Sequence, residues 1–275
     1  MRYLWKSAAG ALTVAAALVA ITLSAAAQGP AVLPPNSSLG EAPGIEEKAD
    51  SLMQQMSDYL ASLKRFTVST EATIEVVLKT GQKLQYASAS ETHVHRPNKL
   101  RSERKGDNAH LRLYYDGKSV TLYGARQNYY AVAPAPPTLD AATDEARDRF
   151  GLAAPGADML YSNVWAGLKT DVISGFCVGP SFVRGIPCQH LAFRGKVVDF
   201  QVWIQDGSKP LPVKYVITSK NTPSCPEFGV VFTKWNVSPG FADDIFTFTP
   251  PKGSMKIKFL ELPKPGQQGA EGGSK

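Results

Sequence analysis

The sequence predicts a mostly β fold with helices (α+β), in which an antiparallel meander of strands carries two or three helices against one face. Three observations lead to this prediction. Apolar and polar residues alternate over several segments, most clearly in Val198–Ile204 and Leu211–Ile217. Pairs such as Asp116-Gly117 between such segments are typical of hairpin turns. A few other stretches carry an apolar stripe with helical spacing, which indicates amphipathic helices.

The start of the chain has the three parts of a secretory signal peptide. Met1–Ser7 is basic, Ala8–Leu23 is apolar, and Ala25 and Ala27 form an A-x-A pattern. The alternative is an uncleaved membrane anchor, but the run is rich in alanine and shorter than the roughly 20 strongly apolar residues that span a bilayer. Position 28 is Gln and not Cys, which argues against cleavage as a lipoprotein. We therefore expect a periplasmic protein, cleaved after Ala27, whose mature form has no transmembrane segment.

Composition divides the rest of the chain into three segments. Residues 28–43 are rich in Pro, Gly and Ser and predict a disordered lead-in, and residues 263–275 predict a disordered tail. Residues 44–262 form one domain, long enough for a sizeable core. The net charge of +6 is mild and the Lys and Arg residues are scattered, so we expect no nucleic-acid partner. We also expect no cofactor and a monomeric protein.

The expected elements follow in the order helix, strands, helices, strands. Ile45–Lys64 is expected to be a helix because its apolar residues recur at spacings of three and four. Phe66–Lys79 alternates with a period of two, which predicts a strand with one buried face, and Leu84–His95 is its returning partner. The remaining strands are expected at Lys99–Lys105, Ala109–Tyr115, Lys118–Tyr123, Tyr129–Ala133, Val172–Val183, Cys188–Arg194, Val197–Gln205, Leu211–Ser219, Phe228–Val237, Ile245–Thr249 and Lys256–Leu262. Short helices are expected at Thr138–Phe150 and within Pro155–Leu168.

Two pairs of residues have the spacing of a chemical site. His93 and His95 lie two apart on a strand, which places both on one face as metal ligands require, but no third ligand is visible nearby. Two surface imidazoles are the better interpretation. Cys188 and His190 have the same spacing, yet no orienting third group can be named, so a buried cysteine beside a hydrogen-bonded histidine is favoured. Local catalytic motifs are absent from the sequence, and we expect no enzyme and no metal site.

The three cysteines are Cys177, Cys188 and Cys225. If Arg184-Gly185 is a two-residue hairpin loop, Val183 lies opposite Ile186, and Cys177 is then about 13 Å out of register with Cys188. A disulfide needs Cα atoms within about 7 Å. We therefore predict that Cys188 is unpaired and that any intrachain bond joins Cys177 to Cys225.

The apolar side of the strands is the expected ligand site. Most aromatic residues on strands belong in a core, but three short helices that cover one face incompletely would leave an apolar cavity. The residues expected to line this cavity share the parity that faces the helices. They are Phe66, Val68, Ile74, Val202, Ile204, Val213 and Tyr215.

Four segments carry a resemblance to a known family: Leu111–Val132, Gly185–Arg194, Phe200–Ile217 and Asp243–Gly253. The chain resembles a family of predicted periplasmic proteins of unknown function, which is similar to the LolA/LolB superfamily of lipoprotein carriers. The likeness covers about Glu46–Leu262. The resemblance implies a LolA-like unclosed half-barrel of about eleven antiparallel strands, wrapped over the helices, whose concave apolar face holds acyl chains.

The resemblance also bears on function. It implies a periplasmic binding or carrier protein for a lipid, a lipoprotein or another hydrophobic ligand. LolA-type carriers have an arginine on an early strand that latches the lid helices; here Leu84–His95 contains none, and Arg96 lies just past its end. The alternative is an envelope interaction or sensor module that binds a protein partner without catalysis. A deep apolar cavity would favour the first function, whereas a filled cavity with an exposed sheet edge would favour the second.

Overall fold

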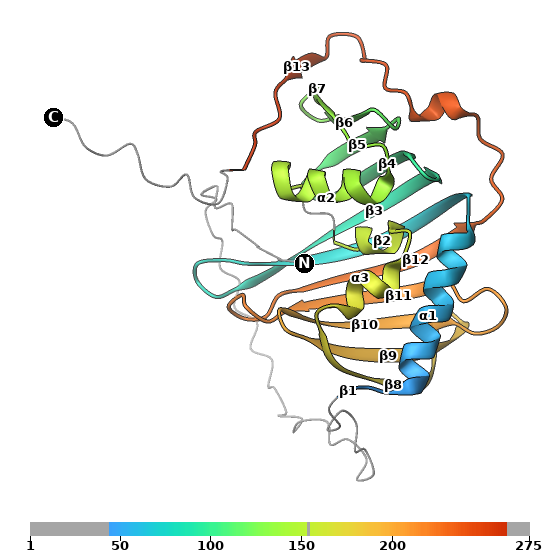
Figure 1. Ribbon diagram of the computed structural model, residues 1–275. Helices are drawn as coiled ribbons and strands as arrows, with labels where there is room; N and C mark the ends of the chain where they lie inside the picture. Colours follow the sequence, from blue (N-terminus) through green and yellow to red (C-terminus); the bar gives the residue numbers. More distant parts are fainter. Residues whose placement is uncertain (1–43, 153–154, 263–275) are drawn as a thin grey trace.

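One unclosed sheet contains every strand of the described part of the chain. The computed structural model describes residues 44–152 and 155–262, and these form a 13-stranded sheet with three α-helices on one face (Figure 1). The strand order is β1-β8-β9-β10-β11-β12-β2-β3-β4-β5-β6-β7-β13. Neighbouring strands are antiparallel except at the two edges of the sheet. There β1 pairs in parallel with β8, and β13 pairs in parallel with β7. The predicted signal peptide, lead-in and tail lie outside the described residues.

The strands before the helix α2 along the chain are β1 (Gly44–Ile45), β2 (Arg65–Val77), β3 (Lys83–His95), β4 (Lys99–Gly106), β5 (His110–Tyr115), β6 (Ser119–Gly124) and β7 (Tyr129–Pro134). Those after it are β8 (Val172–Val183), β9 (Ile186–Gly195), β10 (Val198–Gln205), β11 (Pro212–Ser219), β12 (Glu227–Asn236) and β13 (Met255–Ile257). The α-helices are α1 (Glu47–Ser62), α2 (Leu139–Phe150) and α3 (Val164–Lys169), and two 3-10 helices are η1 (Ala157–Leu160) and η2 (Asp243–Phe246).

The apolar stripe and the capping residues from which the sequence predicts the helices are present in the structure. The buried stripe of α1 contains Ala49, Met53, Met56 and Leu60, at helical spacing. Helix α2 begins at Thr138, whose side chain accepts a hydrogen bond from the backbone N–H of Ala141, and ends at Gly151 with a φ of 62°. The prediction of a single helix within Pro155–Leu168 is only partly right, because the segment forms η1 and then the six-residue α3.

The C-terminal segment differs from the prediction. Ile245–Thr249 is not a strand: its first residues belong to η2, and the chain then runs along the outer side of the sheet to the upper edge (Figure 1). Phe248 packs against the rings of Tyr114, Tyr123 and Tyr130 on that side. The alternation of aromatic and polar residues in this segment therefore arises from aromatic rings that pack on the sheet, and not from strand pairing. The strand expected at Lys256–Leu262 is reduced to β13, which pairs with β7.

The hairpin between β8 and β9 determines which residues lie opposite Cys177 and Cys188. Val183 lies opposite Ile186, as predicted, but a β-bulge at Val178 shifts the register and Cys177 faces Leu191 instead of Ala192. Cys188 faces Ser181. All three cysteines are free thiols in the structure, so the proposed Cys177–Cys225 bond is not formed there.

The hydrophobic core lies between the sheet and the helices. Its members come from α1, α3, η1 and from the inward parity of the strands in both halves of the sheet. The largest fully buried side chains include Trp165 of α3, Tyr215 of β11 and Phe66 of β2. The same surface that the sequence marks as a candidate ligand site is thus the core of the free protein.

Candidate functional site

The inner face of the sheet carries the seven residues expected to line a cavity. Phe66, Val68, Val202, Ile204 and Tyr215 all belong to the hydrophobic core and are at most 5% exposed. Val213 is also buried, but it lies beside the irregularity that β10 and β11 share near Ile204, outside that core cluster. Ile74 differs from the other six because it is half-buried and lies opposite Phe228 and Tyr86.

The space over this face is filled by the protein's own side chains. Trp165, on the short helix α3, is 1% exposed and packs against the ring of Phe193 on β9, with 5.2 Å between the ring centroids. Phe193 stacks in turn on Phe200, which meets Tyr215 edge-on. Trp165 therefore covers the concave face over β9, and its contact with the sheet is apolar.

Helix α3 is fastened to helix α1 by hydrogen bonds. The Asp50 carboxylate accepts a hydrogen bond from the indole Nε1 of Trp165 at 2.8 Å and another from Nζ of Lys169 at 2.6 Å. The hydroxyl of Ser57 accepts a hydrogen bond from the backbone N–H of Trp165 and donates one to Asn163. The bond from Lys169, followed by that from Trp165, lowers the pKa of Asp50. α3 is thus held to α1 by polar contacts, whereas apolar packing holds it to the sheet.

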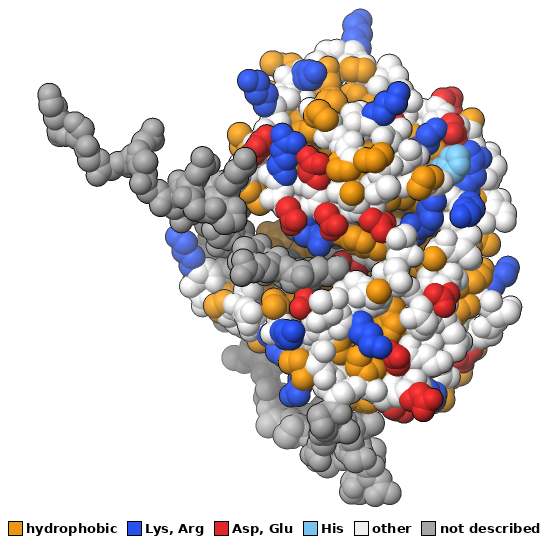
Figure 2. All heavy atoms as spheres, in the orientation of Figure 1, with side chains coloured by type: hydrophobic (Ala, Val, Ile, Leu, Met, Phe, Trp, Pro, Cys, Tyr) orange, Lys and Arg blue, Asp and Glu red, His pale blue; other side chains and the backbone are white. Residues whose placement is uncertain are grey.

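A cleft of about 390 Å³ opens at the mouth of the half-barrel, between the end of α1 and the start of α2. Figure 2 shows charged side chains of both signs among apolar ones on this side of the molecule, where the helices lie. The cleft is lined by residues from α1, from the connection between β3 and β4, from the start of α2 and from the segment before α3: Ala61, Lys64, Arg96, Pro97, Thr138, Asp140 and Ser162. Its lining combines apolar surface with the charged side chains of Lys64, Arg96 and Asp140, and it contains none of the seven predicted residues.

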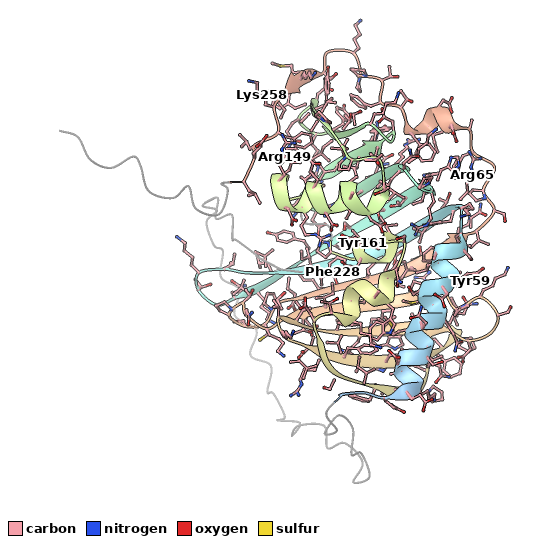
Figure 3. All side chains as sticks on the ribbon, in the orientation of Figure 1. Tyr59, Arg65, Arg149, Tyr161, Phe228 and Lys258 are labelled. Carbon is pink, nitrogen blue, oxygen red and sulfur yellow. The ribbon has the colours of Figure 1, made fainter. Side chains whose placement is uncertain are left out.

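Arg96 is the half-buried cation of this cleft. Its guanidinium lies over the ring of Phe66, with 5.8 Å from Cζ to the ring centroid, and Nη2 donates a 3.3 Å hydrogen bond to the carbonyl of Tyr161. Nε is buried and has no hydrogen-bond partner among the described residues. Burial lowers the pKa of Arg96, and the nearby Asp140 carboxylate partly offsets this effect. Tyr161 itself lies between α2 and α3 (Figure 3).

The sequence interpretation missed a row of hydroxyl groups on the inner face. Thr70 lies 2.7 Å from Ser90, and Thr92 lies 2.8 Å from Ser102, measured between hydroxyl oxygens. These pairs join β2 to β3 and β3 to β4. The signal was present in the alternation of Ser88, Ser90 and Thr92 along β3. The concave face is therefore apolar across the strands that follow α2 and polar over part of those that precede it.

The two pairs with chemical spacing each have their own contacts in the structure. The thiol of Cys188 donates to the carbonyl of Ser181, and burial, with the Asp206 carboxylate second, raises the pKa of Cys188. His190 lies 2.9 Å from the Gln201 amide oxygen and stacks on Trp203. This arrangement is the buried cysteine beside a hydrogen-bonded histidine that the sequence favoured.

His93 and His95 lie on the outer side of the sheet. His95 is 3.0 Å from Asp243, and His93 lines a second, polar cleft of about 300 Å³ beside Glu91 and Phe241. Both imidazoles are partly buried and not fully at the surface. Within residues 44–152 and 155–262, no group of three or more His, Cys, Asp or Glu residues is placed to hold a metal ion.

Fold and site together define a class of protein: an unclosed antiparallel half-barrel whose apolar concave face is covered by helices. The family model described as "Predicted periplasmic protein (DUF2092)" matches residues 49–260. The chain belongs to this family, as the resemblance of its sequence motifs indicated. No helix in the described ranges is long and apolar enough to cross a membrane.

Solved structures with a similar arrangement are distant in sequence. LprF from Mycobacterium bovis is 11% identical with a TM-score of 0.43, and the alignment covers 76% of this chain and 98% of LprF. The LolA superfamily protein NE2245 from Nitrosomonas europaea is 9% identical with a TM-score of 0.38, covering 73% and 97%. MucB is 16% identical with a TM-score of 0.45, covering 75% of this chain and 65% of MucB. The comparison with curated proteins gives no match.

Proposed function

We propose that this protein is a periplasmic binding or carrier protein that holds a hydrophobic ligand, such as a lipid or the acyl chains of a lipoprotein, against the concave face of its sheet. One observation carries the proposal. Trp165, which covers the concave face over β9, belongs to a six-residue helix that meets the sheet through apolar contact and is hydrogen-bonded to α1. An acyl chain offers the sheet the same kind of contact, so it can take the place of the indole when α3 moves away.

Six of the seven predicted residues keep their proposed role in this mechanism, and Val213 lies outside the core cluster. Val202, Ile204 and Tyr215 lie on neighbouring strands and would contact the ligand once α3 has moved. Phe66 and Val68 continue this apolar surface towards the mouth. Ile74, which is half-buried in the free protein, would form the far rim of the site.

The test is native mass spectrometry of the protein purified from its own periplasm without detergent. We expect a bound species heavier than the polypeptide by the mass of one lipid or acyl ligand, which organic extraction releases. The extracted protein should then bind a fluorescent fatty acid at one site. A polypeptide of unmodified mass that also fails to bind the fatty acid would refute the proposal.

A second candidate function, an envelope interaction module, is favoured by two features together: the concave face is filled by the protein's own side chains, and one edge of the sheet is exposed. β1 pairs with β8 only at Ser174 and Gly175, and beyond them Val178 and Phe182 are exposed, Phe182 by 73%. Exposed apolar residues on a strand whose outer edge is unpaired are typical of sites that add a strand from a partner protein. The same mass spectra discriminate the two functions, because a protein partner in one-to-one ratio, without lipid, would favour an envelope interaction module.

Export is the premise of both functions. We propose that cleavage after Ala27 produces a mature chain that begins at Gln28, and we expect N-terminal sequencing of the periplasmic form to return Gln-Gly-Pro. A form that begins at Met1 would contradict cleavage and favour retention as an anchored protein. Replacing Ala25 and Ala27 with bulky residues should block processing, whereas the same change at Ala31 should not.

A further inference from the structure

We propose that the cleft at the mouth of the half-barrel binds the head group of a singly charged anionic amphiphile, such as a phosphodiester lipid, through Arg96 and Lys64. The inference rests on the proposed function and specifies the class of its ligand. The hydrophobic chain would lie under the helices, and the head group would remain at the mouth.

The charges of the cleft favour one negative charge on the ligand. Lys64 and Arg96 contribute two positive charges and Asp140 contributes one negative charge. Asp140 is already engaged, because its carboxylate accepts hydrogen bonds from the backbone N–H of Ser162 at 3.0 Å and from the hydroxyl of Ser162 at 2.5 Å. Lys64 is exposed and forms no ion pair within the described part of the chain. A monoanionic group would balance the remaining positive charge.

The hydrogen-bonding state of Arg96 points to the same partner. A guanidinium has five N–H donors, and a buried donor without an acceptor is costly. In the described structure the Arg96 side chain makes one hydrogen bond, to the carbonyl of Tyr161, while its buried Nε has no partner. The planar fork of an arginine suits two oxygens of a phosphate or carboxylate. An anionic head group would therefore supply the acceptors that the protein itself does not.

The position of Arg96 connects the head group to the apolar site. Its guanidinium lies over Phe66, which is fully buried and belongs to the core that the ligand chain would enter. The cleft volume of about 390 Å³ is enough for a small head group, not for a whole lipid. Only a ligand with a charged end and an apolar chain fits both parts. Since Arg96 also holds the carbonyl of Tyr161, binding of the head group would loosen the segment that precedes α3.

The experiment compares three probes with identical acyl chains on delipidated protein: dioctanoyl phosphatidylglycerol, dioctanoyl phosphatidylcholine and dioctanoylglycerol. We expect the anionic lipid to bind about tenfold more tightly than the other two. Arg96→Gln should remove this preference, so that the variant binds the three probes with similar affinity. Arg96→Lys, which keeps the charge but not the fork, should retain part of the preference. Lys64→Glu changes an exposed side chain. It should weaken the binding of the anionic lipid about fivefold without affecting folding.

The control is Arg101→Gln, which removes an arginine of β4 that lies over Tyr114, outside the mouth cleft. It should bind all three probes as the wild type does. Equal binding of the three probes to the wild type would overturn the head-group site while leaving the proposed function intact. Failure of every probe to bind would overturn both. Binding of inorganic phosphate as tightly as the anionic lipid would also overturn the inference, because it would show a site for free anions.

Discussion

Trp165→Ala is expected to lower the free energy of unfolding by about 3–5 kcal/mol and, at the same time, to make the folded protein bind apolar molecules more strongly. The substitution removes the indole that fills the concave face and leaves an apolar cavity against Phe193. ANS fluorescence of the native variant should therefore rise above that of the wild type. Dodecanoate should raise the melting temperature of the variant more than that of the wild type, because it refills the cavity.

Trp203→Ala provides the matched control. Trp203 is also buried, but it stacks on His190 and lies under the ammonium group of Lys214, away from the inner-face core cluster. Its removal should destabilise the protein without increasing ANS or dodecanoate binding. Equal gains in both variants would show that the probes report general loosening and would contradict a site under α3.

Asp50→Ala is expected to release α3 while the sheet remains folded. The change removes the acceptor for the indole N–H of Trp165 and for Lys169, and an unsatisfied buried donor costs about 1–3 kcal/mol. Hydrogen exchange measured by mass spectrometry should accelerate in peptides from residues 157–169. Peptides from β10 and β11 should keep their protection, because their ladder does not depend on this contact.

The control on the same helix is Asp58→Ala. Asp58 is exposed and accepts a hydrogen bond from Gln54, four residues earlier. Asp58→Ala changes the charge of α1 by the same amount as Asp50→Ala does. Hydrogen exchange in residues 157–169 should nevertheless be unaltered in this variant. If Asp50→Ala instead accelerates exchange throughout the sheet, then α3 and the sheet unfold as one unit and α3 is not a separately movable cover.

Much of the strand order was predictable because the alternation of buried and exposed residues is strong. In β10 and β11, for example, Val202 and Tyr215 are buried on the expected parity. The prediction was wrong where the same pattern had another cause. Phe246 and Phe248 alternate with threonines, as strand residues do, but each occupies an aromatic contact on the outer side of the sheet instead of a ladder position.

The site was less predictable than the fold. Parity along a strand gives the face that a residue occupies, so the apolar lining was accessible from sequence. Neither the indole that fills the face nor the guanidinium at the mouth follows from local pattern, since both depend on how α3 and the β3–β4 connection meet residues far away in sequence. Arg96 contacts Phe66 and Tyr161, which lie 30 residues before it and 65 residues after it.

The two edge strands have a consequence for how the molecule behaves among its own copies. A sheet that does not close leaves two rows of unpaired backbone groups, which invite stacking of one molecule onto another. Here the first and last described strands, β1 and β13, cap these rows, and the uncapped part of β8 is interrupted by the bulge at Val178 and by Pro180, which has no N–H to donate. The part of β8 that stays open is therefore short and irregular, which limits how far a second copy of the sheet can pair along it.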